Sequence, residues 1–383
     1  MMASKADRLK IRNFAQIAEA DLAFSDLTVL VGAQATGKSL ALQWLKVAMD
    51  GRQIVKALHD AGHPTEKSDV LIDLIFGAGM GEAWTSASEI TFNHRKLTPK
   101  GFRRIGGDKE RVFFIPAHRS MLISDGWAAP FQKLTSDTPV VARIFSQNLF
   151  DRFSERGEGP LFPIERVLKK EYRDQISKAV FHDGRVAIEE DRQHAKRLRL
   201  THGEMHLPFM TWTAGQREFT PLLLGLYHLL PPRMLLKQPE IEWVVIEEPE
   251  MGLHPQAVTV VMLLVLDLLW RGYRVVLSTH SPHVLTAVWM ILRLKEYSAR
   301  WQLLCEAFDV HKSQQLQKVA EAALTKDYHV HHLSFENDGK VHSVDISDLD
   351  PVSDDERVAG WGGLTEFSSR FGDAVREAVN EAE

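Results

Sequence analysis

The sequence lacks several features that would each point to a different class of protein. It holds a single cysteine, Cys305, among 383 residues, which excludes an internal disulfide and a cysteine-rich zinc site. Its longest apolar run, Ala257 to Trp270, is interrupted by Asp267 and is too short to span a bilayer. The N-terminal residues show no apolar segment of the kind found in signal peptides. We therefore expect a cytoplasmic protein with no membrane contact.

Neither sign of charge dominates the chain. The net charge is −5 and charged residues make up 25% of the sequence, which is not the balance of a protein that coats nucleic acid. Internal repeats and sustained heptads are also absent, so the sequence indicates neither a solenoid nor a long coiled coil.

A glycine-rich segment stands between a predicted strand and a predicted helix. Residues 27–31 form an apolar, β-branched run, and residues 40–45 continue as a helix. The segment between them fits the P-loop pattern G-x-x-x-x-G-K-[ST]. Its N–H groups are expected to face phosphate oxygens, with Lys38 reaching the β- and γ-phosphates and the Ser39 hydroxyl binding Mg²⁺. The predicted nucleotide-binding loop consists of Gly32, Ala33, Gln34, Ala35, Thr36, Gly37, Lys38 and Ser39.

A second apolar strand, residues 244–247, ends in carboxylates. Glu247 is placed to hold Mg²⁺ opposite Ser39, directly or through water, and Glu248 is the natural general base for an attacking water. Pro249 stops the strand, so the acids should lie at the carboxyl edge of the sheet, where open α/β sheets bind ligands. We interpret Glu250 as a solvated or structural neighbour.

Two further motifs complete an ordered set. Residues 212–216, Trp-Thr-Ala-Gly-Gln, begin a turn before a helix, and such a helix N-terminus attracts anions. Residues 275–280, Val-Val-Leu-Ser-Thr-His, predict an apolar strand that ends in His280.

In this order the motifs resemble those of the ABC-type ATPases, in the branch that contains SMC, Rad50, RecF and OLD-family proteins. The resemblance extends from residue 9 to residue 285. The matching segments are 9–14 (first strand), 113–120 (a strand-and-arginine segment of OLD-like members), 212–218 (signature), 247–255 (Walker B and D-loop) and 277–282 (H-loop).

The resemblance implies a composite site between two copies of the chain. His280 would contact the γ-phosphate of the ATP that is held by Lys38 of the same protomer. Thr213 and Gly215 would reach the ATP of the other protomer through a hydroxyl and a backbone N–H, and residues 251–254 would line the seam. The nucleotide-binding residues implied outside the P-loop are Arg12, Asn13, Thr213, Ala214, Gly215 and Gln216.

The chain departs from the family pattern at a few positions. Gln34 stands where the family usually has Asn, and Thr213 replaces the usual Ser. Glu247 replaces the usual Asp, which favours a metal contact through water. Gln132 and Gln147 are the candidates for the Q-loop glutamine, although a surface role suits both better.

The fold class that we predict is α/β, a P-loop NTPase of ABC-ATPase type. It should have a mixed central sheet with flanking helices, an antiparallel β subdomain and a short helical insertion. The predicted parts are an N-terminal ATPase lobe (1–120), a helical and β insertion (121–209), a C-terminal ATPase lobe (210–300) and a C-terminal α/β extension (301–383). Residues 121–180 are expected to be helical, 183–206 to form two paired strands, 327–347 to alternate as strands, and 363–381 to form an amphipathic helix.

Two other clusters carry weaker signals. His329, His331 and His332 suggest a metal site, but no cysteine or acid completes a ligand set, and we interpret them as exposed residues of an edge strand. The basic stretch 94–104 could touch a phosphate backbone, although scattered solvated charge is the default interpretation. No nuclease pattern follows residue 290.

The sequence therefore predicts an ATPase with ATP and Mg²⁺ as cofactors, acting as a homodimer or a higher homo-oligomer. The resemblance implies control of a separately encoded effector, such as a nuclease, in prokaryotic defence against phage. Two alternatives remain open: a RecF-like DNA-binding ATPase in repair or replication, and a nucleotide-binding scaffold with negligible turnover.

Overall fold

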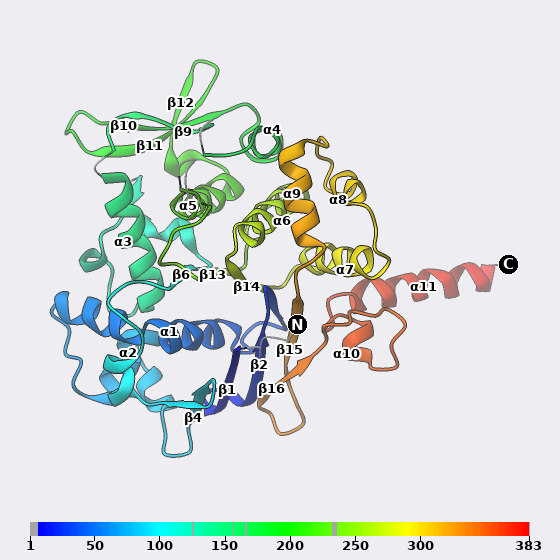
Figure 1. Ribbon diagram of the computed structural model, residues 1–383, viewed down its shortest axis with the longest axis horizontal. Coiled ribbons are helices and arrows are strands. Elements are labelled where there is room, and N and C mark those ends of the chain that lie inside the picture. The colour runs from blue at the N-terminus through cyan, green and yellow to red at the C-terminus, as the bar shows by residue number, and fades with distance from the viewer. Residues whose placement is uncertain (1–6, 125, 155, 165–166, 232–235, 383) are drawn as a thin grey trace.

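Ten strands form one central sheet in the computed structural model, which describes residues 7–124, 126–154, 156–164, 167–231 and 236–382 (Figure 1). The strand order is β5-β4-β1-β2-β16-β15-β3-β14-β13-β6. These strands are β1 (Asp7–Phe14), β2 (Ile17–Phe24), β3 (Leu27–Val31), β4 (Glu89–Phe92), β5 (Arg95–Leu97), β6 (Val112–Ile115), β13 (Trp243–Glu247), β14 (Arg274–Thr279), β15 (Tyr328–Phe335) and β16 (Val341–Asp345).

The half of the sheet from β15 to β6 is parallel. Three of these strands, β3, β6 and β13, are mostly apolar and are buried along their whole length, as is usual for parallel strands covered by helices. In this register Val31 pairs with Thr279, and Glu247 pairs with Ser278. The residues that follow β3, β13 and β14 therefore meet at one edge of the sheet.

The other half is an antiparallel wing of β1, β2, β4 and β5. β16 joins the two halves because it pairs parallel with β2 and antiparallel with β15. The predicted mixed central sheet is confirmed.

Helices cover both faces of the sheet (Figure 1). α1 (Lys38–Asp60) and α2 (Ser68–Phe76) pack on one face around Leu30 and Val245. α3 (Val140–Ser154) contributes to the cores on both faces. The other face, around Val29 and Val244, is covered by α5 (Ala214–Leu229), α6 (Pro255–Trp270), α7 (Pro282–Glu296), α8 (Trp301–Ala307) and α9 (Gln314–Ala323). Among the described residues, no helix is long and apolar enough to cross a membrane.

The predicted insertion, residues 121–209, is only partly helical. A four-stranded antiparallel sheet, β12-β11-β10-β9, lies beside α5 (Figure 1). The predicted pair of strands is confirmed as β10 and β11, and the expectation that 121–180 is helical is wrong in part. Prolines at 130, 160 and 163 interrupt the helical pattern, and the short segments 123–124, 127–128 and 159–162 near them pair as strands. Residues 125, 155, 165 and 166 lie outside the described part. The elements are β7 (Ile123–Ser124), β8 (Trp127–Ala128), β9 (Gly159–Phe162), α4 (Lys170–Ile176) followed by a π turn (Ser177–Phe181), β10 (Arg185–Glu190), β11 (Lys196–His202) and β12 (Met205–Pro208).

The C-terminal strands belong to the central sheet. β15 lies between β3 and β16, so the interpretation of its histidines as exposed residues of an edge strand is wrong. His331 and His332 are only 2% and 8% exposed, because an interior strand is covered on both faces.

The predicted amphipathic helix is confirmed as α11 (Glu366–Ala382), which follows α10 (Glu356–Ala359). The short 3₁₀ helices are η1 (Met80–Ala83), η2 (Pro99–Arg104), η3 (Arg119–Leu122), η4 (Phe131–Lys133) and η6 (Phe209–Thr211).

Candidate nucleotide-binding site

The P-loop connects β3 to α1 and requires its two glycines. Gly32 has a φ of +149°, and a Cβ there would lie 2.2 Å from the carbonyl oxygen of Leu333 in β15. Gly37, the N-cap of α1, has a φ of +81°, and a Cβ there would lie 2.9 Å from the Ile17 side chain. The loop is therefore enclosed by β15 on one side and by the β1–β2 hairpin on the other.

Lys38 is folded back onto its own loop. Its Nζ donates hydrogen bonds to the carbonyl oxygens of Gly32 (2.9 Å) and Ala33 (2.8 Å). Burial lowers the pKa of Lys38 to about 8, although Glu248 and Glu250 oppose that shift. Ala33, Gln34 and Ala35 are exposed at the tip of the loop. The ammonium group is thus already inside the curl of the loop, where phosphate oxygens would be its stronger partners.

Glu247 is the buried carboxylate of the site. It ends β13 and is 5% exposed, and its Oε2 accepts a hydrogen bond from the backbone N–H of Ala117 (3.3 Å). Burial raises its pKa to about 7, and the nearby Ser39 hydroxyl works against that rise. The second oxygen, Oε1, has no hydrogen-bond partner among the described residues. A buried oxygen without a partner beside a serine hydroxyl fits a position that a cation would occupy.

Glu248 and His280 directly follow the neighbouring strands β13 and β14, and their side chains face each other. The Glu248 Oε1 lies 3.5 Å from the His280 Nε2, and both side chains are partly exposed. Glu248 has a φ of +41°, and its N–H donates to the carbonyl of Ser278 (2.9 Å), which fixes the turn after β13 against β14. The two predicted catalytic side chains are therefore brought together.

Glu250 holds the backbone of His280 in place through hydrogen bonds. Its Oε1 accepts hydrogen bonds from the Thr279 hydroxyl and from the backbone N–H of His280, both at 2.7 Å. Glu250 therefore has the structural role that the sequence suggested, and it contacts the H-loop (residues 277–282).

The sequence indicated Arg119 only as part of the segment 113–120, and the structure shows which groups it contacts. It is fully buried at the start of η3. Its guanidinium donates to the carbonyl oxygens of Pro116 (3.1 Å), Glu247 (2.8 Å) and Glu248 (3.3 Å), and its Nε donates to that of Glu218 (3.3 Å). Burial lowers its pKa, while the surrounding acids oppose the shift. This arginine holds the turn that carries both acids.

The signature motif caps α5. Thr213 and Gln216 form a reciprocal capping box, with each side chain bonded to the backbone N–H of the other. A Cβ at Gly215 would lie 2.9 Å from the carbonyl oxygen of Gly252, so the signature packs against the turn after Glu250. Thr213 and Ala214 are exposed. Among the described residues, no hydrogen bond joins the signature to the P-loop of the same chain.

Arg12 and Asn13 lie on the β1–β2 hairpin, which also borders the P-loop. Arg12 pairs with Glu19 (2.7 Å), and the Asn13 side chain donates to the Ala87 carbonyl (3.3 Å). The residue of this hairpin that touches the loop is Gln16, whose Nε2 donates to the carbonyl of Ala35 (2.9 Å). No sequence pattern singled out Gln16, because its position depends on how the hairpin folds over the loop.

The two candidates for the Q-loop glutamine lie elsewhere. Gln132 is exposed, and Gln147 accepts a hydrogen bond from the Phe131 N–H (2.7 Å) while donating to Asp151 (2.6 Å). Both bonds of Gln147 stabilise α3 and the η4 turn.

The second half of this site lies in a part of the chain that matches a known protein family. Residues 208–286 match the family described as AAA domain, putative AbiEii toxin, Type IV TA system. This range contains the signature, both acids and His280, and β3 with its P-loop pairs directly with β14 inside it. The mixed sheet, the order of the motifs and this family match support the resemblance to ABC-type ATPases that the sequence predicted.

Several solved structures are similar to this chain at low sequence identity. The SMC head domain from Thermotoga maritima is 13% identical with a TM-score of 0.39, covering 89% of this chain and 99% of that one. The SmcHead bound to the C-winged helix domain of ScpA is 12% identical with a TM-score of 0.44, covering 89% and 97%. The cbiO1 protein from Clostridium perfringens, part of the ABC transporter complex cbiONQ, is 11% identical with a TM-score of 0.33, covering 72% and 79%. None of the curated proteins compared with the chain matches it.

Proposed function

We propose that this chain binds ATP with Mg²⁺ at the P-loop and hydrolyses the ATP at an interface between two copies arranged head to tail. Lys38 exchanges its loop carbonyls for the β- and γ-phosphates. Ser39 and Glu247 hold Mg²⁺, Glu248 accepts the proton of the attacking water, and His280 contacts the γ-phosphate.

The unpartnered oxygen of Glu247 carries this proposal. A buried carboxylate is unfavourable unless a proton or a cation joins it, and burial raises the pKa of Glu247 to about 7. A serine hydroxyl, one carboxylate and the phosphates form a hard oxygen set that suits Mg²⁺, which also retains water ligands. The Glu247 side chain thus favours the metal over an empty site near neutral pH.

The exposed signature supports the two-copy arrangement. Thr213 and Ala214 present a capped helix N-terminus to solvent, and no hydrogen bond of the described residues joins them to the P-loop of their own chain. A phosphate held by a second copy would satisfy such a helix N-terminus. Thr213, Ala214, Gly215 and Gln216 then act in trans, while Arg12 and Asn13 border the nucleotide from the β1–β2 hairpin.

The direct test compares ATP hydrolysis by wild-type protein with that of Lys38→Ala. The matched control is Lys318→Ala, which removes an exposed lysine from α9. We expect Lys38→Ala to lose hydrolysis while the control retains it. Equal rates for Lys38→Ala and wild type would refute the assignment. Tight ATP binding by a wild-type protein without turnover would instead favour a nucleotide-binding scaffold.

We infer further that the ATP cycle controls a separately encoded effector, such as a nuclease, in defence against phage. The name of the matching family mentions a toxin and a TA system, which supports a setting with a second protein. The segment 121–180 and the region after residue 300 provide surfaces that the predicted ATP chemistry does not use.

Co-expression with neighbouring genes, followed by affinity capture with and without ATP, tests the effector. Nucleotide-dependent retention of a neighbour's product is the expected result. Failure to retain any product, combined with tight and salt-sensitive DNA binding by the chain alone, would favour the RecF-like alternative.

A further inference from the structure

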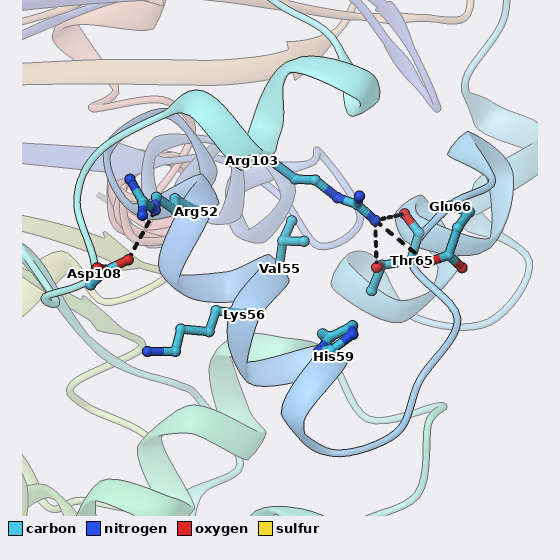
Figure 2. Close-up of a pocket in the computed structure, with 8 residues that line it drawn as sticks. All are labelled: Arg52, Val55, Lys56, His59, Thr65, Glu66, Arg103 and Asp108. Carbon is cyan, nitrogen blue, oxygen red and sulfur yellow. Dashed lines mark hydrogen bonds and ion pairs between the residues drawn. The ribbon is translucent and has the colours of Figure 1, made fainter.

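A basic pocket lies on the helix that starts at the P-loop, far from the P-loop itself. It has a volume of about 460 Å³ and is lined by one face of α1, by the loop before α2 and by η2 with the residues that follow it (Figure 2). Arg52 stands fourteen positions after Lys38, so the helix rise separates the two by roughly 20 Å. The lining residues are Arg52, Val55, Lys56, His59, Thr65, Glu66, Arg103 and Asp108.

The walls of this pocket are fixed to each other by the backbone. α1 departs from helical geometry at Asp50 (φ −126°, ψ 22°), and a Cβ at Gly51 would lie 2.9 Å from the carbonyl oxygen of Phe102. The N–H of Arg52 donates to the carbonyl of Ile105 (2.8 Å). The end of η2 is therefore tied to the second half of α1, and the pocket does not depend on a mobile wall.

Arg103 is tied to the loop before α2 by two hydrogen bonds. Its Nη2 donates to the Thr65 hydroxyl (2.8 Å) and to the Thr65 carbonyl (3.2 Å), as Figure 2 shows. These bonds hold the planar guanidinium in place and leave its other N–H groups available. A preorganised guanidinium loses little entropy when it binds a second partner.

The carboxylates of the pocket are weak competitors for its cations. Asp108 pairs with Arg52 at 2.9 Å, and Glu66 lies 3.6 Å from Arg103, but their side chains are 55% and 70% exposed. Exposed ion pairs of this kind contribute at most about 1 kcal/mol each. A ligand with two or more negative charges can therefore replace them.

Lys56 supplies a further positive charge from α1, four residues after Arg52. It extends from the exposed face of α1, and Figure 2 draws no interaction from it to any lining residue. Within the described part of the chain it has neither a hydrogen bond nor an ion pair to a carboxylate. The pocket thus combines two arginines that have replaceable partners with one lysine that has none.

The stretch of sequence that contains η2 adds further positive charge near the pocket. Residues 90–107 contain five lysines and arginines and no aspartate or glutamate, in a chain whose net charge is −5. Lys100 and Arg104 of this stretch are exposed on η2 beside Arg103.

We propose that this pocket is a second, non-catalytic site that binds a phosphate-bearing ligand. Guanidinium groups bind phosphate oxygens through paired, charge-assisted hydrogen bonds, and the volume lies in the range of small-molecule sites. The phosphate can belong to a free polyphosphorylated small molecule or to the backbone of a nucleic acid, and the chemistry of recognition is the same. The proposal does not rest on ATP hydrolysis.

The test measures the binding of two phosphate-bearing probes to protein that carries Lys38→Ala, so that binding at the P-loop is reduced. Inorganic tripolyphosphate is titrated by calorimetry, and a fluorescein-labelled single-stranded oligonucleotide is titrated by anisotropy. Lys56→Glu is compared with Lys318→Glu, which makes the same charge change at an exposed lysine on α9. Arg103→Lys keeps the charge of the pocket but removes the paired donors.

We expect Lys56→Glu to weaken binding of at least one probe roughly tenfold or more, the scale of a lost charge-assisted contact. Lys318→Glu should change it less than about twofold, and Arg103→Lys should give an intermediate loss. Binding of tripolyphosphate identifies the ligand as a free small molecule, whereas binding of the oligonucleotide alone identifies a nucleic-acid backbone. Absence of binding by both probes, or equal losses in Lys56→Glu and Lys318→Glu, would overturn the proposal.

Discussion

Glu247→Gln should make the nucleotide-free protein more stable at alkaline pH while removing its use of Mg²⁺. Glu247 is 5% exposed, and burial raises its pKa from the ordinary 4.5 to about 7. A carboxyl group whose pKa is higher in the folded chain than in the unfolded chain binds its proton more tightly in the folded state. The unfolding free energy therefore falls as the pH rises from about 4.5 to about 7, and the loss is complete above the folded pKa.

The size of the effect follows from the shift. A rise from 4.5 to about 7 corresponds to about 3 kcal/mol at about 1.4 kcal/mol per pKa unit. Because the side chain is buried, solvent screening does not reduce this figure much. Glutamine has a similar shape and cannot ionise, so the variant avoids the loss. Its stability relative to wild type should rise by about 3 kcal/mol between pH 4.5 and pH 8.

Urea denaturation of both proteins, without nucleotide, across this pH range measures the difference. Other titrating groups cancel when the variant is subtracted from wild type. Glu204→Gln, at an exposed turn, is the matched control and should show no such trend. Addition of Mg²⁺ and ATP should stabilise wild type more than Glu247→Gln at pH 8. A stability difference that stays constant with pH would refute the account of Glu247 as a buried carboxylate awaiting a cation.

Two further predictions concern turnover. Glu248→Gln should keep ATP affinity but lower the steady-state hydrolysis rate by about 100-fold or more, because it removes the proposed general base; a near-normal rate would transfer the role to another acid. Gly215→Asp should be inactive alone, since any Cβ there meets the Gly252 carbonyl at 2.9 Å and the carboxylate would repel a phosphate. Mixed with Lys38→Ala, it should restore at most one active site per dimer, as measured by hydrolysis against mixing ratio. Full activity of isolated Gly215→Asp would show that the signature is not needed.

The site elements that the sequence predicted share one property: each follows a recognisable apolar strand or begins a helix. The P-loop, Glu247, Glu248 and His280 meet because the ends of parallel strands share one edge, so local patterns were sufficient. Gln16 was missed because its contact with Ala35 depends on the fold of a distant hairpin. The burial of His331 was missed because alternation on a strand does not reveal whether β15 is an edge strand or lies inside the sheet.

Arg119 explains how the parts of one chain can act as a unit at the proposed interface between two copies. Through its Nε it holds the carbonyl of Glu218, in the signature helix α5, and through its other nitrogens it holds the carbonyls of Glu247 and Glu248. Gly215 packs against Gly252 on the same side. These contacts fix the signature to the turn that carries the acids, so each copy can present both elements as a rigid body. If two such copies associate as proposed, little has to be ordered, so less of the binding free energy is lost to conformational entropy.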